Sequence, residues 1–256
     1  MSQVISGIEE RKLWGVALKL YNIVIAIARY MLKLLPLSIS LKMLFKAEDL
    51  LRVLIAKEAI RWGKGIHPKH WLTDYHRFFI ENIADGESVL DIGCGAGELT
   101  YDIAVRARPR LVMGIDMNPK AIAVAKQRYE GKVHNLKFIV GKAPDDLPEM
   151  EFDVVVLSNV LEHQEDRISF LKSIIVKVKP RKALIRVPMF ERDWRVPLRK
   201  VLSLNYFLDP THYIEYTYSA LYRELEAAGL TVKKLVVKWG EFYVVCEPKH
   251  AGRDAS

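Results

Sequence analysis

Two kinds of apolar spacing divide the chain. Up to residue 62 the apolar positions follow helical periodicity, which predicts one helix over 9–35, ended by Pro36, and a second over 38–62. A further helix is expected to end near Ile83. Beyond it, apolar runs of strand length alternate with helical stretches, which predicts an α/β fold with a parallel sheet covered on both faces. The expected strands are 88–92, 111–115, 136–140, 152–157, 183–187, 231–237 and 242–246, and the expected helices are 99–106, 119–129, 166–178 and 217–228.

The first helix carries a narrow polar or small stripe among apolar residues. The stripe consists of Lys12, Gly15, Lys19, Asn22, Ala26, Arg29 and Lys33. A basic stripe with Trp14 and Tyr21 beside a broad apolar face suits a helix that lies in a membrane interface. The same pattern suits a helix packed on the domain as a lid, and both alternatives stay open. Lys19 and Arg29 disfavour a spanning helix, and no signal-peptide cleavage site is evident.

The charge distribution separates the same two regions. Residues 1–70 carry 12 Lys and Arg against 5 Asp and Glu, whereas residues 71–256 carry 27 against 26. The nearly neutral second part argues against a nucleic-acid-binding catalytic domain, so no nucleic-acid partner is expected. We therefore expect a helical extension over 1–63, a domain over 64–249 and a tail over 250–256.

The two cysteines, Cys94 and Cys246, are too few for a disulfide framework or a zinc cluster. No metal is expected on this basis. Cys94 is expected to fill a small space. The low cysteine content fits a reducing cytoplasm, and the basic extension adds a peripheral location at the inner membrane face as the alternative.

The strongest motif is a glycine turn that follows an apolar strand. It reads Asp91-Ile92-Gly93-Cys94-Gly95-Ala96-Gly97 and leads into a helix. Glycines permit tight backbone angles and close approach of a ligand, and the helix N-terminus offers free N–H groups. The spacing G-x-G-x-G differs from the dinucleotide fingerprint G-x-G-x-x-G. Because Asp91 would repel a pyrophosphate, the motif favours a cationic amino-acid ligand such as S-adenosylmethionine.

A carboxylate ends the next strand. Asp116, followed by Met117, lies 23 residues beyond Gly93, where it is placed to accept both hydroxyls of a ribose. A helix N-cap role for Asp116 is the simpler alternative. The pairing with the glycine turn favours the ribose.

A third motif, Ser158-Asn159-Val160-Leu161-Glu162-His163, completes a resemblance to class I S-adenosylmethionine-dependent methyltransferases. The resemblance spans about 64–247. It also includes Gly65-Ile66-His67-Pro68, Ile185-Arg186-Val187-Pro188 and Asp209-Pro210-Thr211-His212-Tyr213. It implies a Rossmann-like seven-stranded sheet whose last strand is antiparallel. It also implies cofactor contacts from the loop 91–97, Asp116, Met117, Asn159 and the turn after the third strand.

That turn departs from the family pattern. Relatives often have Asp-Ala where this chain has Lys142-Ala143, and a lysine side chain cannot accept a hydrogen bond from adenine. Backbone at Lys142 or Ala143, or the side chain of Asp145, is expected to take that role.

The acceptor side is inferred mainly from the resemblance. It makes His163 and His212 candidate general bases. His70 and Tyr75 are candidates for closing over the cofactor or for simple packing. The segment 188–213 is expected to be an acceptor lid or an ordinary connection. As a lid it would favour an anionic acceptor through its cationic side chains. The candidate substrate-binding residues are His70, Tyr75, Arg186, Arg192, Arg195 and Tyr213.

The expected function is in-line methyl transfer from S-adenosylmethionine to a small-molecule, glycan or lipid-linked acceptor. A non-catalytic cofactor-binding or scaffold protein on the same fold is the alternative, because fold does not fix function.

Overall fold

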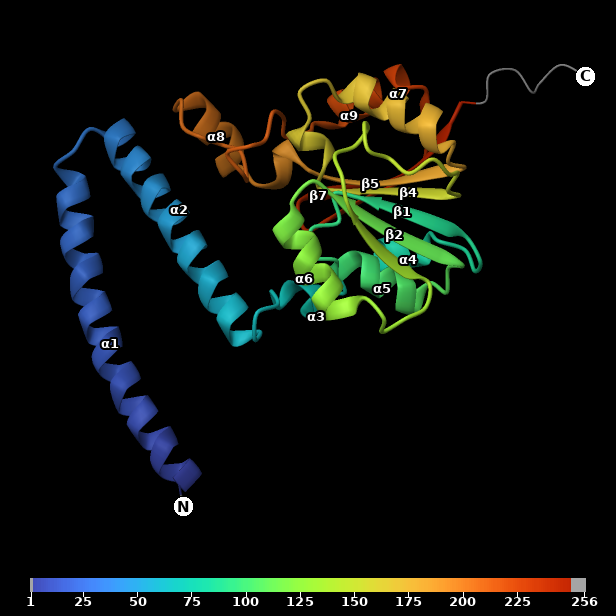
Figure 1. Cartoon of the computed structure of the whole chain (residues 1–256). Helices are drawn as coiled ribbons and strands as arrows, with labels where there is room; N and C mark the ends of the chain where they lie inside the picture. The colour runs from blue at the N-terminus through green and yellow to red at the C-terminus, as the bar shows by residue number, and fades with distance from the viewer. Residues whose placement is uncertain (1, 250–256) are drawn as a thin grey trace, which may run out of the picture. The chain divides into compact units, whose positions relative to one another are not determined.

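The computed structural model describes residues 2–249, with side chains from residue 11 onward. It consists of two units that divide between Gly65 and Ile66 (Figure 1). The predicted tail over 250–256 lies outside the described residues.

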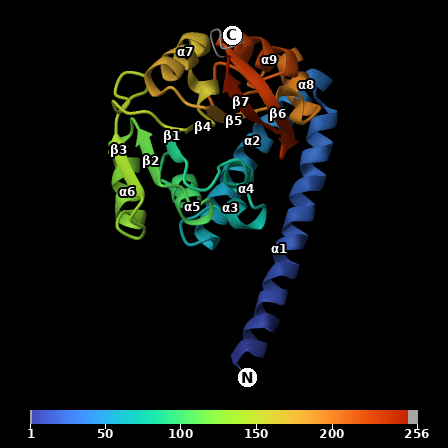
Figure 2. The same ribbon diagram turned by 90° about the vertical axis from the view of Figure 1, so that its right-hand side faces the viewer.

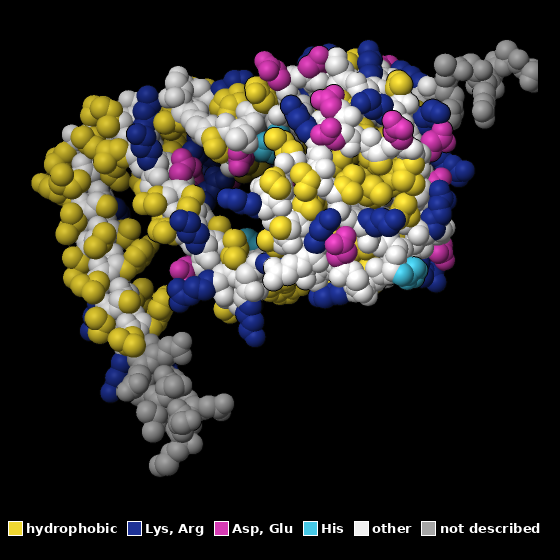
Figure 3. All heavy atoms as spheres, in the orientation of Figure 1, with side chains coloured by type: hydrophobic (Ala, Val, Ile, Leu, Met, Phe, Trp, Pro, Cys, Tyr) yellow, Lys and Arg dark blue, Asp and Glu magenta, His cyan; other side chains and the backbone are white. Residues whose placement is uncertain are grey.

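The first unit consists of two long helices, α1 (Ser2–Lys33) and α2 (Leu37–Trp62). Pro36 separates them, as its lack of an N–H group requires, and the Ser40 hydroxyl donates to the Leu32 carbonyl at 2.8 Å. Large apolar side chains gather along both helices (Figure 3). Residues Arg11–Lys33 form a helix long and apolar enough to cross a membrane by length and composition, with a mean hydropathy of 1.4 and no buried residue.

The second unit is built on a seven-stranded sheet in the order β3-β2-β1-β4-β5-β7-β6. Strands β1 to β5 run parallel to one another, and β7 runs antiparallel to both β5 and β6. This confirms the predicted fold class, including the antiparallel last strand. The strands are β1 (Ser88–Ile92), β2 (Leu111–Asp116), β3 (Leu136–Val140), β4 (Val154–Ser158), β5 (Lys182–Pro188), β6 (Leu230–Lys238) and β7 (Glu241–Pro248).

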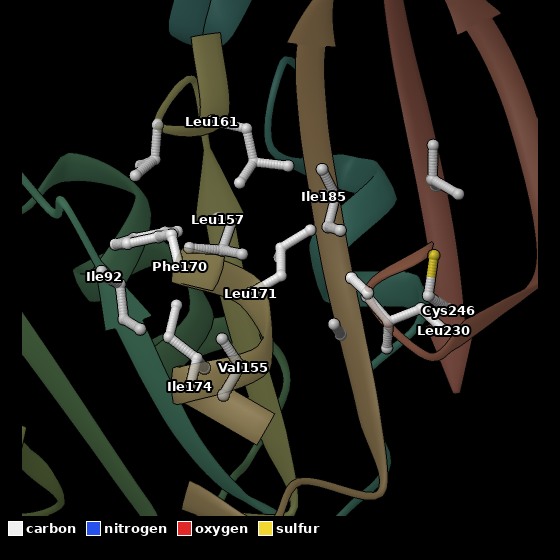
Figure 4. Close-up of a cluster of buried hydrophobic side chains, with 14 of the residues drawn as sticks. Ile92, Val155, Leu157, Leu161, Phe170, Leu171, Ile174, Ile185, Leu230 and Cys246 are labelled. Carbon is white, nitrogen blue, oxygen red and sulfur yellow. The ribbon is translucent and has the colours of Figure 1, made fainter. Parts of the chain in front are cut away.

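Helices cover both faces of this sheet (Figures 1 and 2). One face packs against α4, α5 and α6, and the other packs against α7 and α9. Figure 4 shows the second interface, where Phe170 and Ile174 of α7 meet Val155 and Leu157 of β4. The central strands β1 and β4 are almost wholly buried, which explains their continuous apolar runs. The helices are α4 (Arg77–Glu81), α5 (Glu98–Arg106), α6 (Pro119–Tyr129), α7 (Arg167–Val178) and α9 (Tyr218–Ala227).

Two segments differ from the sequence-based expectation. The short helix α3 (Lys69–Leu72) was not expected and precedes α4, and Asp74 between them has a positive φ of 45°. The segment 188–213, expected as a lid or connection, contains the short turn η2 (Phe190–Arg192) and the helix α8 (Arg195–Val201). Neither contains a long apolar repeat, so periodicity did not reveal them.

Candidate active site

A cavity of about 320 Å³ lies where the parallel strands end. Strand order reverses between β1 and β4, and parallel sheets open a crevice at such a point. The cavity is lined by residues at or just after the carboxyl ends of β1 to β4, including Gly93, Asp116, Gly141 and Asn159. The topology therefore brings the three sequence motifs together at one edge of the sheet.

The glycine loop needs glycine for both conformation and space. Gly93, Gly95 and Gly97 have φ values of +72°, +55° and +82°. A Cβ on Gly93 would lie 2.7 Å from Val160 Cγ2, and one on Gly97 would lie 2.7 Å from Phe138 Cζ. No described atom lies within 4 Å of a Cβ position on Gly95. The loop is thus packed against the domain at both ends and open in its middle.

Asp116 holds this loop and also lines the cavity. Its Oδ2 accepts from the Gly95 amide at 2.8 Å, and its Oδ1 accepts from the Asn118 amide at 2.8 Å. Asn118 is the N-cap of helix α6, so Asp116 does not have the N-cap role that was its simpler alternative. Each carboxylate oxygen keeps a further lone pair, which suits two ribose hydroxyls. Met117 lies beside it with 67% of its surface exposed and also lines the cavity.

Asp91 lies away from the cavity lining. Its side chain is 1% exposed and accepts a hydrogen bond from the Thr100 hydroxyl at 2.7 Å. Burial raises the pKa of Asp91 to about 7. The structure therefore places this carboxylate beneath the glycine loop, where it anchors the start of α5. Cys94, whose thiol pKa burial also raises, packs close to Gly114.

The turn after β3 supplies the cavity wall opposite the glycine loop. Lys142 and Ala143 both line the cavity. The Lys142 carbonyl accepts from the Asp146 amide at 2.9 Å, and the Lys142 amide donates to the Asp146 carboxylate at 2.9 Å, so both backbone groups of Lys142 are already engaged. Of the alternatives weighed for the adenine contact, this arrangement favours Ala143.

Asn159 connects the cavity to a buried polar network. It adopts a left-handed conformation with φ +59°, which asparagine tolerates better than most residues. Its Oδ1 accepts from Arg186 Nε at 2.7 Å, and its amide donates to Glu241 at 3.2 Å. The Tyr75 hydroxyl donates to the same carboxylate at 2.9 Å, and the Arg186 guanidinium lies 3.9 Å from the centroid of the Tyr75 ring. Burial raises the pKa of Tyr75, which keeps this hydroxyl a donor.

Tyr75, Arg186 and Asn159 were predicted from the sequence, whereas Glu241 was not. Glu241 begins β7 and lies 166 residues from Tyr75 along the chain. In the sequence, Glu241 is recognisable only as a polar residue at the start of an apolar strand. Such residues are common, so this pattern alone does not predict a functional role. Tyr75 and Arg186 thus form one buried network with the cofactor-side residue Asn159.

His70 lies in a different hollow. It lines a second cavity together with Asp74, His76 and Asp102 rather than the one at Asp116. Its Nδ1 is 3.0 Å from His76 Nε2, and His76 Nδ1 is 3.1 Å from Asp102 Oδ2. The pKa of His70 is lowered to about 4, mainly because the ring is buried and secondly because of the nearby His76. The ring is therefore neutral at pH 7.

The two candidate bases lie together. The rings of His163 and His212 are 4.6 Å apart between centroids, and His163 lines the cofactor cavity. The pKa of His163 is lowered, mainly because the ring is buried and secondly because of the nearby His212. Glu162 has a carboxylate oxygen within 4.8 Å of a ring nitrogen of each histidine; it is fully buried, and burial raises its pKa to about 8. His212 Nδ1 lies 3.0 Å from the carboxylate of Glu215, which the sequence analysis missed.

The candidate substrate residues of the 188–213 segment have different environments. Arg192 is bound to the buried Glu215 carboxylate and donates to the Tyr206 carbonyl at 3.0 Å. Arg195 is partly exposed and pairs with its neighbour Asp193. The Tyr213 side chain is 57% exposed, and its backbone amide donates to the Glu162 carbonyl at 2.7 Å. Arg192 therefore supports the histidine pair, whereas Arg195 and Tyr213 face solvent.

The cavity fits S-adenosylmethionine in the features that the structure shows. Asp116 offers acceptors for a ribose, and the open Gly95 leaves room for a ligand against the backbone. Ile115, Val160 and Phe170 give the cavity an apolar wall suited to a flat base. When bound, this cofactor supplies a methyl group on a cationic sulfur.

Comparisons with known proteins agree with this geometry. Residues 83–192 match a family described as a methyltransferase domain. A ribosomal protein L11 methyltransferase from Burkholderia orbicola is 34% identical over 129 residues, which are 50% of this chain and 40% of the relative. A mitochondrial ubiquinone biosynthesis O-methyltransferase from Schizosaccharomyces pombe is 38% identical over 140 residues, 51% of this chain and 50% of the relative. The chain thus spans half or less of these relatives.

Solved structures share the fold. One chain of the complex between the Haloferax volcanii Trm112 methyltransferase activator and a methyltransferase superposes with a TM-score of 0.58 at 18% identity. That match covers 73% of this chain and 93% of the other. Magnesium protoporphyrin IX methyltransferase from Synechocystis with bound S-adenosylhomocysteine gives a TM-score of 0.55 at 16% identity, over 75% and 86% of the two chains.

The family match and the shared fold cover the same segment that carries the cavity. Residues 83–192 therefore match a methyltransferase domain, and the unit that carries the cavity has the fold of solved methyltransferases, one of them with bound S-adenosylhomocysteine.

Proposed function

We propose that the whole protein transfers a methyl group from S-adenosylmethionine to an oxygen of a small-molecule, glycan or lipid-linked acceptor. The observation that carries this proposal is the position of His163. It lines the cofactor cavity and touches a second cluster of polar groups that the cofactor does not need. A hydroxyl or carboxyl acceptor needs a partner at that position, because its oxygen must be aligned and its proton removed.

The roles of the chain's own residues follow from their contacts. Asp116, Met117 and Ala143 hold the nucleoside part, and the glycine loop receives the amino-acid part. His163 and His212 face the acceptor. In the transfer the acceptor oxygen gives its proton to the histidine pair and forms a bond to the methyl carbon. The carbon–sulfur bond breaks, and the electron pair stays on sulfur.

Cofactor binding is the first test. We expect stoichiometric binding of S-adenosylmethionine to the full-length protein by calorimetry, and label transfer from the methyl-labelled cofactor into a product of cell extract, identified by mass spectrometry. Absence of cofactor binding would overturn the proposal. Binding without turnover on any acceptor would favour the non-catalytic alternative.

The first unit supports an acceptor at or near a membrane. The α1 side chains Leu20 and Val24 are 60% and 61% exposed, and its charged residues include Lys19 and Arg29. Exposed apolar area flanked by basic groups binds anionic bilayers. We therefore infer a cytoplasmic protein held peripherally on the inner membrane face.

Vesicle co-sedimentation tests this location. Replacing Leu20 and Val24 by Lys should abolish sedimentation with phosphatidylserine-containing vesicles. A matched control replaces Val176 and Val201, which are 72% and 80% exposed in the second unit, by Lys and should sediment like the unaltered chain. Equal sedimentation of all three proteins would remove the membrane argument and favour the lid.

A further inference from the structure

Three potential metal ligands converge at the edge of the cofactor cavity. Glu162 and His163 come from the short turn η1 (Leu161–His163) after β4, and His212 comes from the segment before α9. One ligand atom from each side chain lies within 4.8 Å of the ligand atoms of the other two. Because His163 also lines the cofactor cavity, this cluster adjoins the place where an acceptor must lie.

Glu162 is the unusual member of the cluster. It is 0% exposed, and no other described residue hydrogen-bonds to either of its carboxylate oxygens. Buried carboxylates are ordinarily paired or coordinate a metal, because an unpartnered one loses its hydration without compensation. The cluster therefore lacks a partner for Glu162, and a cation between the three side chains would supply it.

The surrounding hydrogen bonds fix both histidines in the form that binds metals. The Thr211 hydroxyl donates to Asp209 at 2.6 Å, so at 2.8 Å it accepts from His163 Nδ1–H. His212 Nδ1 lies 3.0 Å from Glu215, and an ionised carboxylate can only accept. In both rings Nδ1 carries the proton, which leaves the lone pair on Nε2. Such outer contacts orient the histidine ligands of metal sites.

The outer contact of His212 is itself held in place. The Glu215 side chain is 0% exposed, binds Arg192 and accepts from the Leu208 amide at 2.7 Å. The neighbouring turn is tied to the cluster by the hydrogen bond from the Tyr213 amide to the Glu162 carbonyl. The three ligands are thus pre-positioned by the fold.

We propose that Glu162, His163 and His212 bind one divalent first-row transition metal ion through a carboxylate oxygen and two Nε2 atoms. Two histidines and one carboxylate are a ligand set suited to Zn²⁺, Mn²⁺, Co²⁺ and Fe²⁺, and three protein ligands leave positions open for substrate. In its role toward the acceptor the site rests on the proposed function. It narrows the acceptor to one with an oxygen that coordinates the ion, which lowers the pKa of a bound hydroxyl.

This proposal revises the expectation of no metal. That expectation weighed only the two cysteines, whereas the ligands here are histidine and glutamate residues from segments about fifty residues apart. It also gives the histidine pair a role other than general base.

Metal binding is measured directly on the full-length protein. After treatment with a chelator and dialysis, the protein is titrated with ZnCl₂ by calorimetry and with CoCl₂ by visible absorption. We expect one ion per chain and cobalt absorption bands of a coordinated site. Glu162→Gln and His212→Asn should each weaken Zn²⁺ binding at least 100-fold. Thr211→Val, which removes only the orienting hydroxyl, should weaken it about 10- to 100-fold.

His134→Asn is the matched control, because His134 is exposed and lies outside the cluster. It should bind Zn²⁺ like the unaltered chain. Failure of the unaltered chain to bind any of Zn²⁺, Co²⁺ or Mn²⁺ stoichiometrically would overturn the proposal, as would undiminished binding in Glu162→Gln. If His212→Asn does not fold, Zn²⁺ binding by Glu162→Gln and Thr211→Val still tests the proposed site.

Cofactor calorimetry on the same samples separates the two proposals. Metal binding without S-adenosylmethionine binding would leave the site standing and defeat the proposed function. If the protein binds the cofactor and transfers methyl groups but has no affinity for metal ions, the proposed function stands and the metal site is overturned.

Discussion

The cofactor side of the cavity and the side proposed for the acceptor are built in different ways. The cofactor side uses backbone and short-range contacts, such as the glycine loop 91–97 and the Asp116 carboxylate that holds Gly95. The side proposed for the acceptor uses side chains joined by buried polar contacts, such as those of Glu215 with Arg192 and with His212. The first should depend on backbone shape and the second on the completeness of a polar network.

The largest expected effect breaks the acceptor side. Arg192→Met leaves the Glu215 carboxylate buried without its cation, which should cost about 3–5 kcal/mol of unfolding free energy. Arg195→Met removes a partly exposed pair with Asp193 and should cost about 0–1 kcal/mol. Denaturant unfolding measures both. Equal stability of the two variants would mean that Arg192 is not the support that its contacts indicate.

The next effect tests the shape of the cofactor side. Gly97→Ala brings a Cβ to 2.7 Å from Phe138 Cζ, and overpacking of this kind costs about 1–3 kcal/mol. S-adenosylmethionine affinity should fall at least tenfold as the loop shifts. Gly86→Ala is the control, because Gly86 also has a positive φ (+77°) but no described atom within 4 Å of its Cβ position. Its cofactor affinity should be unchanged in calorimetry, and an equal loss in both variants would point to backbone strain alone.

Asp116→Asn sharpens the same side. It removes a charged acceptor, worth about 1.5–3 kcal/mol, so the affinity for S-adenosylmethionine should fall about 10- to 150-fold. Asp85→Asn, which alters an exposed pair with Arg108, should bind the cofactor normally. Normal binding by Asp116→Asn would remove the ribose role.

The smallest effect concerns pH. The pKa of Asp91 is about 7 in the folded protein against an ordinary value near 3.8, so the folded state binds this proton more tightly than the unfolded state does. Protonation of Asp91 therefore contributes its full stabilisation of the folded state below about pH 4, and this contribution is lost as the pH rises toward 7. Asp91→Asn should melt at a higher temperature than the unaltered chain at pH 8, with a smaller difference at pH 5. A difference that does not vary with pH would contradict the buried acid.

The sequence predicted the elements of the sheet well because their signals are local. The strand 88–92 was expected at the same residues as β1, since a strand buried on both faces is apolar throughout. The segments α3 and α8 were not resolved into helices, because four and seven residues hold too few turns for a periodic signal.

The sequence by itself determined the methyl donor's side. The glycines and Asn159 follow a strand and Asp116 ends one, and parallel strands must end at a common edge, so local motifs were enough to bring these residues together. Only the tertiary structure decided the acceptor side. Arg192 and Arg195 look alike in the sequence, yet one is buried on Glu215 and the other pairs near the surface. Burial and long-range pairing depend on which distant segments pack together, and that information is absent from any local pattern.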